Sequence, residues 1–388
     1  MLGLSYLKQS SLSPVWWRRT TIAVLIMTLL LATGCRQRNR TAERLAEDSA
    51  AAQEIESNLT FNNITLEQAN EQGQTLWNVR ADQAIYSQDQ QIAQVTNPDG
   101  ELFQDGKPIF RIQASQGEVR ENGETIMLRG QVVATDIKTG AVLRGDELDW
   151  NPAQGLLIIR GNLRGSHPQF QMSANEGRVL TRDRRMELSG QVVGLASNPT
   201  VRLQGERLTW NMDAETAVSD RPLRIDRLQG SQILDTATGE RAEFNLKTKI
   251  ATLTQNAFLN LADPPVQVSG NSLIWNLTAR TVNANQPLTV VHRQQQVTLT
   301  ANQGQIDLQK RIMYLTQNVR AEGQRNQSQL RSDRLTWNIP TQDFLAEGNV
   351  DYRQNNPLVT SRGPRATGKL QNQTIVLSGG RITTQIVP

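Results

Sequence analysis

The feature that most constrains the fold of this chain is a unit of about 31 residues that returns ten times after Gln74. The clearest copies read PIFRIQASQGEV, PQFQMSANEGRV and QQVTLTANQGQI, and a sister type reads VLRGDELDWN or QVSGNSLIWN. Self-similarity at a fixed period indicates a repeat architecture, so this unit decides the fold class. Every copy aligns on one small residue in its middle: Ala81, Ala114, Gly145, Ala174, Gly205, Gly239, Gly270, Ala301, Ser332 and Gly363.

Apolar residues alternate with polar ones on both sides of the small residue, which is typical of a strand with one buried face. Phe110 and Ile112 stand four and two places before Ala114, whereas Leu148 and Trp150 stand three and five places after Gly145. The parity therefore slips by one residue in the middle of the unit. Such a slip would turn the apolar set outward unless the strand bends there. We expect a corner at the small residue, where the chain passes from one sheet to a facing one.

A short polar turn and a return strand such as IMLRGQVVAT or MELSGQVVGL complete each unit. The chain is therefore predicted to be all-β, an elongated antiparallel structure of two sheets built from ten two-strand repeats of about 31 residues. The interval between small residues is widest from Gly205 to Gly239, and Asn198 and Pro199 mark a loop after Ala196. These signs divide the repeats into residues 58–196 and 197–388, the latter being a second module or a continuation of the first.

The segment before the repeats has the parts of an export signal. Arg18 and Arg19 precede an apolar run that ends at Leu31, which is shorter than the roughly twenty residues that span a bilayer. Small residues then lead to Cys35, the only cysteine, as in a bacterial lipobox. Residues 1–35 are predicted to be a signal peptide with lipid attachment at Cys35, and residues 36–57 a tether. The alternative is an uncleaved membrane anchor with an incidental thiol.

Charge and motifs exclude several function classes. The formal net charge is +4, but the segment before Cys35 contributes three basic residues and no acid, which leaves too little charge for a nucleic-acid surface. Only two histidines exist, His167 and His292, and both stand between units, where a surface position is expected. No metal-ligand spacing, phosphate-binding loop or nucleophile motif is present, so we expect no metal, no cofactor and no enzymatic activity.

The sharpest local motif is Leu-x-Trp-Asn, which recurs in every second unit. Two interpretations stay open. The rings fill the core between the sheets, or they line a groove for an apolar ligand. The tryptophans concerned are Trp150, Trp210, Trp275 and Trp337, with Trp77 in the first unit.

The order of these motifs resembles the LptC family of lipopolysaccharide export proteins. The resemblance is carried by the G-x-x-x-W-N-V-R-A run from Gly73 to Ala81, by Tyr86 and by the copy FRIQASQGEV. The repeated A-x-x-G, hairpin, L-x-G-x-V pattern is similar to periplasmic domains of the LptA/OstA type. The family differs in having a single module on an uncleaved transmembrane helix, whereas this chain is about twice as long.

The resemblance implies a twisted β-jellyroll, open along one side, whose apolar interior holds the acyl chains of lipopolysaccharide. It also implies partners: an inner-membrane export ABC transporter and LptA-like periplasmic jellyrolls. The location implied is the periplasm, with the N-terminus anchored to the inner membrane. By repeat alignment, the residues expected to line this trough are Phe110, Ile112, Leu128, Val132, Phe170, Met172, Leu188, Val192, Val297, Leu299, Leu315 and Val319, beside Trp150, Trp210, Trp275 and Trp337.

The function expected from these features is transport of lipopolysaccharide, or a comparable glycolipid, from the inner to the outer membrane by a tethered lipid-binding protein. A structural or adhesive cell-envelope lipoprotein with a closed interior is the alternative. A polysaccharide-active enzyme on a β-helix is disfavoured, because β-helix coils repeat at a shorter period.

Overall fold

The repeats form one antiparallel sheet that is folded lengthwise into two facing layers. The computed structural model describes residues 59–387, apart from residues 88–90, 121–124, 169, 264, 326, 356 and 371–373. Within these residues, 28 strands join a single hydrogen-bonded sheet, and the only helical element is the short 3-10 turn η1 (Arg293–Gln295). The predicted all-β class is confirmed, and the two sheets prove to be two halves of one.

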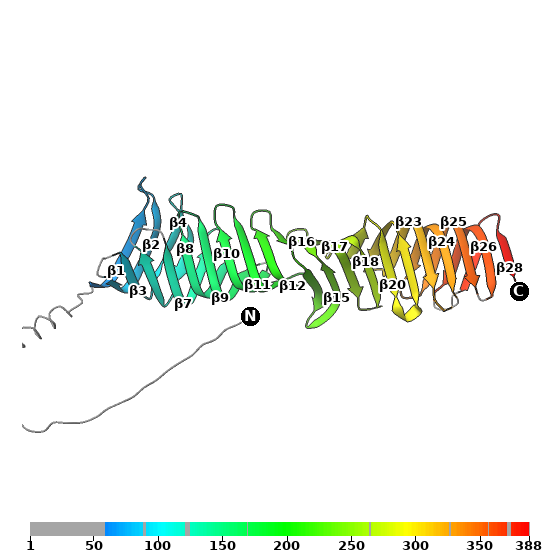
Figure 1. Cartoon of the computed structure of the whole chain (residues 1–388), viewed down its shortest axis with the longest axis horizontal. Helices are drawn as coiled ribbons and strands as arrows, with labels where there is room; N and C mark the ends of the chain where they lie inside the picture. The colour runs from blue at the N-terminus through cyan, green and yellow to red at the C-terminus, as the bar shows by residue number, and fades with distance from the viewer. Residues whose placement is uncertain are drawn as a thin grey trace, which may run out of the picture. The chain divides into compact units, whose positions relative to one another are not determined.

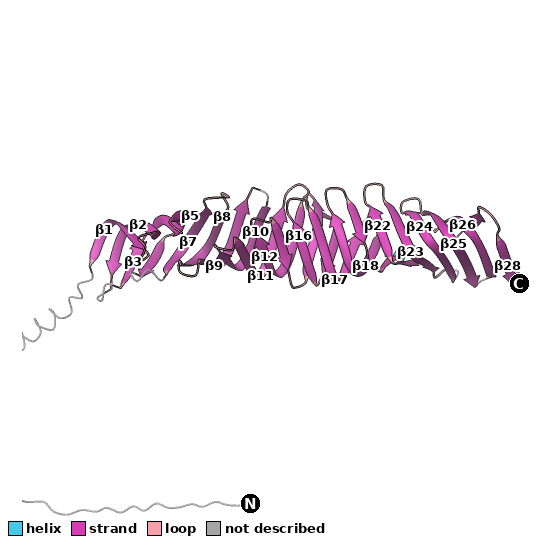
Figure 2. Ribbon diagram, turned by 90° about the horizontal axis from the view of Figure 1, so that it is seen from above, coloured by secondary structure: helices cyan, strands magenta, loops and turns pink. Residues whose placement is uncertain are grey.

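Strands follow one another in chain order from β1 at one end to β28 at the other (Figures 1 and 2). Contacts group Asn58–Pro388 into one unit. Fourteen strands run through both layers: β1 (Thr60–Ala69), β2 (Thr75–Tyr86), β7 (Ile126–Asp136), β8 (Val142–Asn151), β9 (Leu156–His167), β10 (Phe170–Leu180), β11 (Arg185–Ala196), β12 (Val201–Asn211), β17 (Ile250–Leu261), β18 (Val266–Asn276), β23 (Ile312–Gly323), β24 (Ser328–Asn338), β25 (Asp343–Asn355) and β26 (Leu358–Lys369).

In the other passages of the chain across both layers, the strand is divided at the corner into two shorter strands, one in each layer. Pro98, Pro222 and Pro287 lie at three of these splits, where a proline cannot donate to the ladder. The halves in layer A are β3 (Ile92–Thr96), β6 (Gln116–Arg120), β13 (Thr216–Ser219), β16 (Arg241–Asn245), β19 (Thr281–Ala284), β22 (Gln303–Asp307) and β27 (Thr374–Ser378). Those in layer B are β4 (Asp99–Gln104), β5 (Lys107–Gln113), β14 (Leu223–Gln229), β15 (Gln232–Gly239), β20 (Leu288–His292), β21 (Val297–Ala301) and β28 (Thr383–Val387).

The small residues lie at the corners, as the parity slip predicts. In β8 the buried positions change parity between Leu143 and Leu148, on either side of Gly145. A Cβ atom at Gly145 would collide with the side chain of Ile159 on β9, so only glycine allows the two strands to approach there.

The return strands bend at a two-residue bulge, which was not predicted from the sequence. In the β7–β8 ladder the register steps from Arg129 opposite Glu147 to Val132 opposite Gly145, which leaves Gly130 and Gln131 as a bulge. Both bulge residues have positive φ, 73° and 51°. The same double left-handed step recurs at Gly161–Asn162, Gly190–Gln191, Gln255–Asn256, Gln317–Asn318 and Gly348–Asn349. Glycine, asparagine and glutamine at these places are therefore corner residues.

The division at Ala196 stays a prediction. β11 and β12 pair from Arg185 opposite Asn211 to Ala196 opposite Val201, interrupted only by the bulge at Gly190–Gln191, and the turn between them contains a cis peptide bond before Pro199.

Candidate functional site

The interior between the two layers holds every residue that repeat alignment assigned to a trough. Fifteen of the sixteen have side chains no more than 7% exposed, and Phe170 is half-buried against the same core. Those in layer B are Phe110, Ile112, Val132, Phe170, Met172, Val192, Val297, Leu299 and Val319. Those in layer A are Leu128, Leu188, Leu315, Trp150, Trp210, Trp275 and Trp337. Their role in ligand binding stays a prediction.

The tryptophans of the Leu-x-Trp-Asn motif form a row along layer A. Trp150, Trp275 and Trp337 are at most 1% exposed, so packing in the core is their evident structural role. Trp77 departs from the pattern, because it pairs with Leu102 of β4 and therefore lies in layer B. The indole N–H groups of all five tryptophans are buried and have no hydrogen-bond acceptor among the described residues. A buried indole N–H usually finds an acceptor, so a repeated lack of one is unusual.

The flank opposite the corners is where the turns of layer A face the strand ends of layer B, and we call it the seam. At the corners the chain itself joins the layers. Across the seam, the described residues form no strand pairing and no backbone hydrogen bond. Among the described residues, only side chains connect the layers on this flank, so separating the layers there would break no strand pairing.

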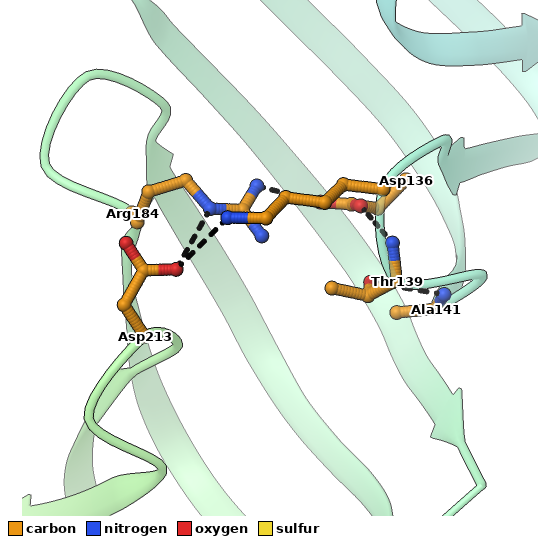
Figure 3. Close-up of polar contacts among 6 residues, drawn as sticks. Asp136, Thr139, Ala141, Arg184 and Asp213 are labelled. Atoms are coloured by element: carbon orange, nitrogen blue, oxygen red, sulfur yellow. Dashed lines mark hydrogen bonds and ion pairs between the residues drawn. The ribbon is translucent and has the colours of Figure 1, made fainter.

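A polar cluster closes the seam in the N-terminal half (Figure 3). Arg184, in a turn of layer A, donates to the Asp136 carboxylate of layer B at 3.0 Å, and the Asp136 side chain is only 4% exposed. Asp136 also accepts a hydrogen bond from the backbone N–H of Thr139. Asp213 of layer A lies 3.2 Å from Lys138 of layer B and 3.6 Å from Arg184. The hydrogen bond from Lys138 is the main cause that lowers the pKa of Asp213.

Aromatic rings fill the space beside this cluster. Phe170 of layer B meets Trp210 of layer A edge to face, with ring centroids 4.6 Å apart. His167 stacks on Phe170 at 5.0 Å and contacts Trp210 at 5.9 Å. Burial lowers the pKa of His167, although the charges of Glu215 and Asp136 act in the opposite direction. This half of the seam is therefore shut by both polar and aromatic contacts.

The central part of the seam is less closed. Arg311 of layer A lies 3.3 Å from Asp263 of layer B, but the Asp263 side chain is 80% exposed. A pocket of about 260 Å³ lies between the layers beside this ion pair. It is lined on the layer B side by Arg227, Asp235 and Leu261, and on the layer A side by Arg280, Ile306, Leu308, Arg311 and Ile339.

Towards the C-terminus the seam is held by His292, whose expected surface position is wrong. Its side chain is buried at 2% exposure, and its Nε2 lies 3.3 Å from the Gln342 amide nitrogen of layer A. Burial lowers the pKa of His292 below its ordinary value of 6.5, although its backbone hydrogen bond raises it. An apolar cavity of about 50 Å³ lies further along the interior, lined by Val297, Leu299 and Phe344 among others.

A row of residues at the rim of layer A was not predicted from the sequence. Seven turns of this layer in the described part of the chain end in one residue with positive φ, whose carbonyl oxygen accepts a hydrogen bond from the backbone N–H that follows the next strand. Six of the seven N–H groups bonded in this way belong to apolar residues, and four of the seven rim residues are basic. A largely basic rim therefore lies beside an apolar row. The rim residues are Gly155, Arg184, Glu215, Lys249, Arg280, Arg311 and Gln342. The signal in the sequence is the cation at the last place of four of these turns, Arg184, Lys249, Arg280 and Arg311.

The described residues contain no group of three or more His, Cys, Asp or Glu side chains that could hold a metal ion. Nor does any helix in this part of the chain have the length and apolar character to cross a bilayer. The predicted signal peptide, Cys35 and the tether at 36–57 lie outside the described residues.

Comparison with known proteins gives a family match over most of the chain. The model described as "Lipopolysaccharide-assembly, LptC-related" matches residues 22–152, 156–258 and 268–385. Among solved structures, the chain is similar to LptH, the LptA homologous periplasmic component of the lipopolysaccharide transport device of Pseudomonas aeruginosa. The identity is 12%, the match covers 38% of this chain and 82% of LptH, and the TM-score is 0.21. The curated protein sequences contain no match.

Proposed function

Because the chain belongs to the LptC-related family of lipopolysaccharide-assembly proteins, we propose that it carries lipopolysaccharide across the periplasm with its acyl chains between the two layers. A place in periplasmic lipopolysaccharide transport follows from the family. The lipid site, the absence of catalysis and the tether are our proposal.

One observation carries the lipid site: in the part of the chain that the structure describes, the two layers are joined by the chain on one flank and by side chains alone on the other. The interior between them is apolar along the whole array. An acyl chain gains about 0.8 kcal/mol for each buried CH₂ group, so a continuous apolar interior lets lipid move without meeting water. Entry through the seam would break only side-chain contacts.

The proposed tether is the segment before the repeats. A lipid on Cys35, or an uncleaved N-terminal anchor, would hold the carrier at the inner membrane beside an export ABC transporter. LptA-like jellyrolls would then continue the route. Mass spectrometry of the mature N-terminus distinguishes the two tethers, because diacylation of Cys35 adds the mass of the lipid and removes the residues before it.

Photocrosslinking from inside the array tests the lipid site. Phe344 lines the apolar cavity and is 8% exposed, whereas Tyr314, also in layer A, is 37% exposed on the outer face. We expect a photoreactive phenylalanine analogue at 344 to crosslink to lipopolysaccharide in cells. The same analogue at 314 should not. Equal crosslinking at both positions, or none at 344, contradicts the proposal and favours a structural or adhesive role.

Acidic substitutions are a poorer test of this interior. Ile112 and Leu188 are 0% and 1% exposed. A carboxylate at either place would be buried without a partner, which costs several kcal/mol and would unfold the repeat around it. Loss of lipid would then report loss of structure.

A further inference from the structure

The central seam pocket combines a charged mouth with an apolar floor. Ile306, Leu308 and Ile339 of layer A and Leu261 of layer B line its apolar part. Around them stand three arginines and two aspartates, contributed by both layers: Arg227, Arg280, Arg311, Asp235 and Asp263. The pocket is about 260 Å³ in volume and lies beside the exposed ion pair of Arg311 and Asp263.

The charges in this pocket do not cancel. Arg227 is paired with Asp235, and both side chains are largely buried, at 15% and 7% exposure. Arg280 donates only to the carbonyl oxygen of Leu308, at 3.4 Å, and has no ion-pair partner among the described residues. Arg311 is paired with Asp263, which is 80% exposed and can return to water at little cost. An incoming anion would therefore meet Arg280, which has no counter-charge, and Arg311, whose ion pair is easily broken.

Two of the unpaired indole N–H groups belong to the row of layer A that contains the pocket floor, each two strands away from Ile306. The ladder runs from Trp275 through Val282 to Ile306, and from Ile306 through Met313 to Trp337. Ile306, on the pocket floor, thus lies in the same row of layer A between the two tryptophans. Their indole nitrogens are buried without an acceptor. A ligand that carries carbonyl oxygens into the interior would supply one.

We propose that this pocket is the headgroup site for an anionic acylated amphiphile. Its phosphate binds Arg280 and Arg311 at the rim, one of its acyl carbonyl oxygens accepts a hydrogen bond from Trp275, and its hydrocarbon continues between the layers. The proposal rests on the function proposed above and adds what that function lacks, a fixed position for the polar part of the lipid. Guanidinium groups suit phosphate because they bind it through two parallel hydrogen bonds.

The test uses three short lipids that separate phosphate from carbonyl. They are dioctanoyl phosphatidic acid, its dioctyl ether analogue without carbonyl groups, and dioctanoylglycerol without phosphate. Binding to the purified full chain is measured by calorimetry, with inorganic phosphate as a fourth ligand. We expect phosphatidic acid to bind tightest, and each of the other two lipids to bind about tenfold more weakly.

Three variants should then change the affinity for different sets of these lipids. Arg280→Gln should weaken both phosphate-bearing lipids about tenfold and leave dioctanoylglycerol unchanged. Trp275→Phe keeps an aromatic ring but removes the N–H, so it should weaken the two acyl lipids and leave the ether analogue unchanged. Asp263→Asn should release Arg311 and tighten phosphatidic acid about threefold. Arg320→Gln, at an exposed arginine on the outer face of β23, is the matched control.

Three outcomes overturn the site. Equal binding of all three lipids would show that no headgroup is recognised. Tight binding of inorganic phosphate that depends on Arg280 would assign the pocket to free phosphate. A lack of binding by every lipid, with the lipopolysaccharide crosslink at 344 intact, would leave the carrier function standing without this pocket. Absence of the crosslink at 344 in a chain with no other substitution would instead overturn the carrier function itself.

Discussion

The N-terminal and central parts of the seam have the same interior but different closures. In the N-terminal part, Arg184 reaches a buried carboxylate, Asp136, beside packed aromatic rings. In the central part, Arg311 reaches Asp263, which is exposed, and a pocket lies beside the pair. The two ion pairs are equivalent in the repeat, because each joins residues 48 positions apart. The two parts of the seam therefore differ in how far the carboxylate at equivalent positions is buried.

The largest effect should come from the shared core. Trp150 lies in the N-terminal half and Trp275 in the centre, and both are at most 1% exposed. Replacing either with alanine should lower the free energy of unfolding by about 3–5 kcal/mol, since each change leaves a large cavity. Urea unfolding of the full chain measures this, with Val376→Ala, at a position 63% exposed, as the control. A much smaller loss at Trp275 would show that the central core is already loose, which would place the difference inside the layers.

The next effect should be confined to the closed part of the seam. Asp136→Ala removes the carboxylate that binds Arg184 and the Thr139 N–H, so it should cost about 1–3 kcal/mol. Hydrogen exchange should rise in the turns that flank Asp136 and Arg184. Asp136→Asn keeps an oxygen for Thr139 and should lose less. Unchanged exchange in Asp136→Ala would mean that the aromatic rings alone close this part.

A smaller effect should appear on acidification. Burial keeps the pKa of His292 below 6.5, so the unfolded chain takes up a proton at a higher pH than the folded chain does. Stability should therefore be full above pH 6.5 and decline as pH falls towards the folded pKa. His292→Leu should reduce this decline, measured as Tm against pH. Part should remain, because burial lowers the pKa of His167 as well. A decline of the same size in His292→Leu would contradict the assignment.

The smallest effect should come from the exposed ion pair. Asp263→Ala should change the free energy of unfolding by no more than about 0.5 kcal/mol, because a solvent-exposed pair contributes little. Set beside Asp136→Ala, this result would measure the difference between the two parts of the seam. Equal costs at Asp136 and Asp263 would remove the comparison altogether.

The corners show which bends of the chain a local sequence pattern can predict. The parity slip marked the small residues as bends, and the structure confirms this at Gly145. The bends of the return strands were not predicted, although Gly130 and Gln131 belong to the repeated L-x-G-x-V pattern. The reason is physical: a glutamine inside an alternating strand gives no local sign of positive φ, and only the backbone reveals it.

By itself, the sequence determined the all-β class, the period of the array and which residues face inward, because alternation and repetition are local properties of the chain. The seam was decided only in three dimensions. Asp136 and Arg184, Lys138 and Asp213, and His292 and Gln342 are 48, 75 and 50 positions apart, and none of these distances is a whole number of units. Such pairs meet because the folded layers face each other with an offset, and that offset leaves no mark in the one-dimensional pattern.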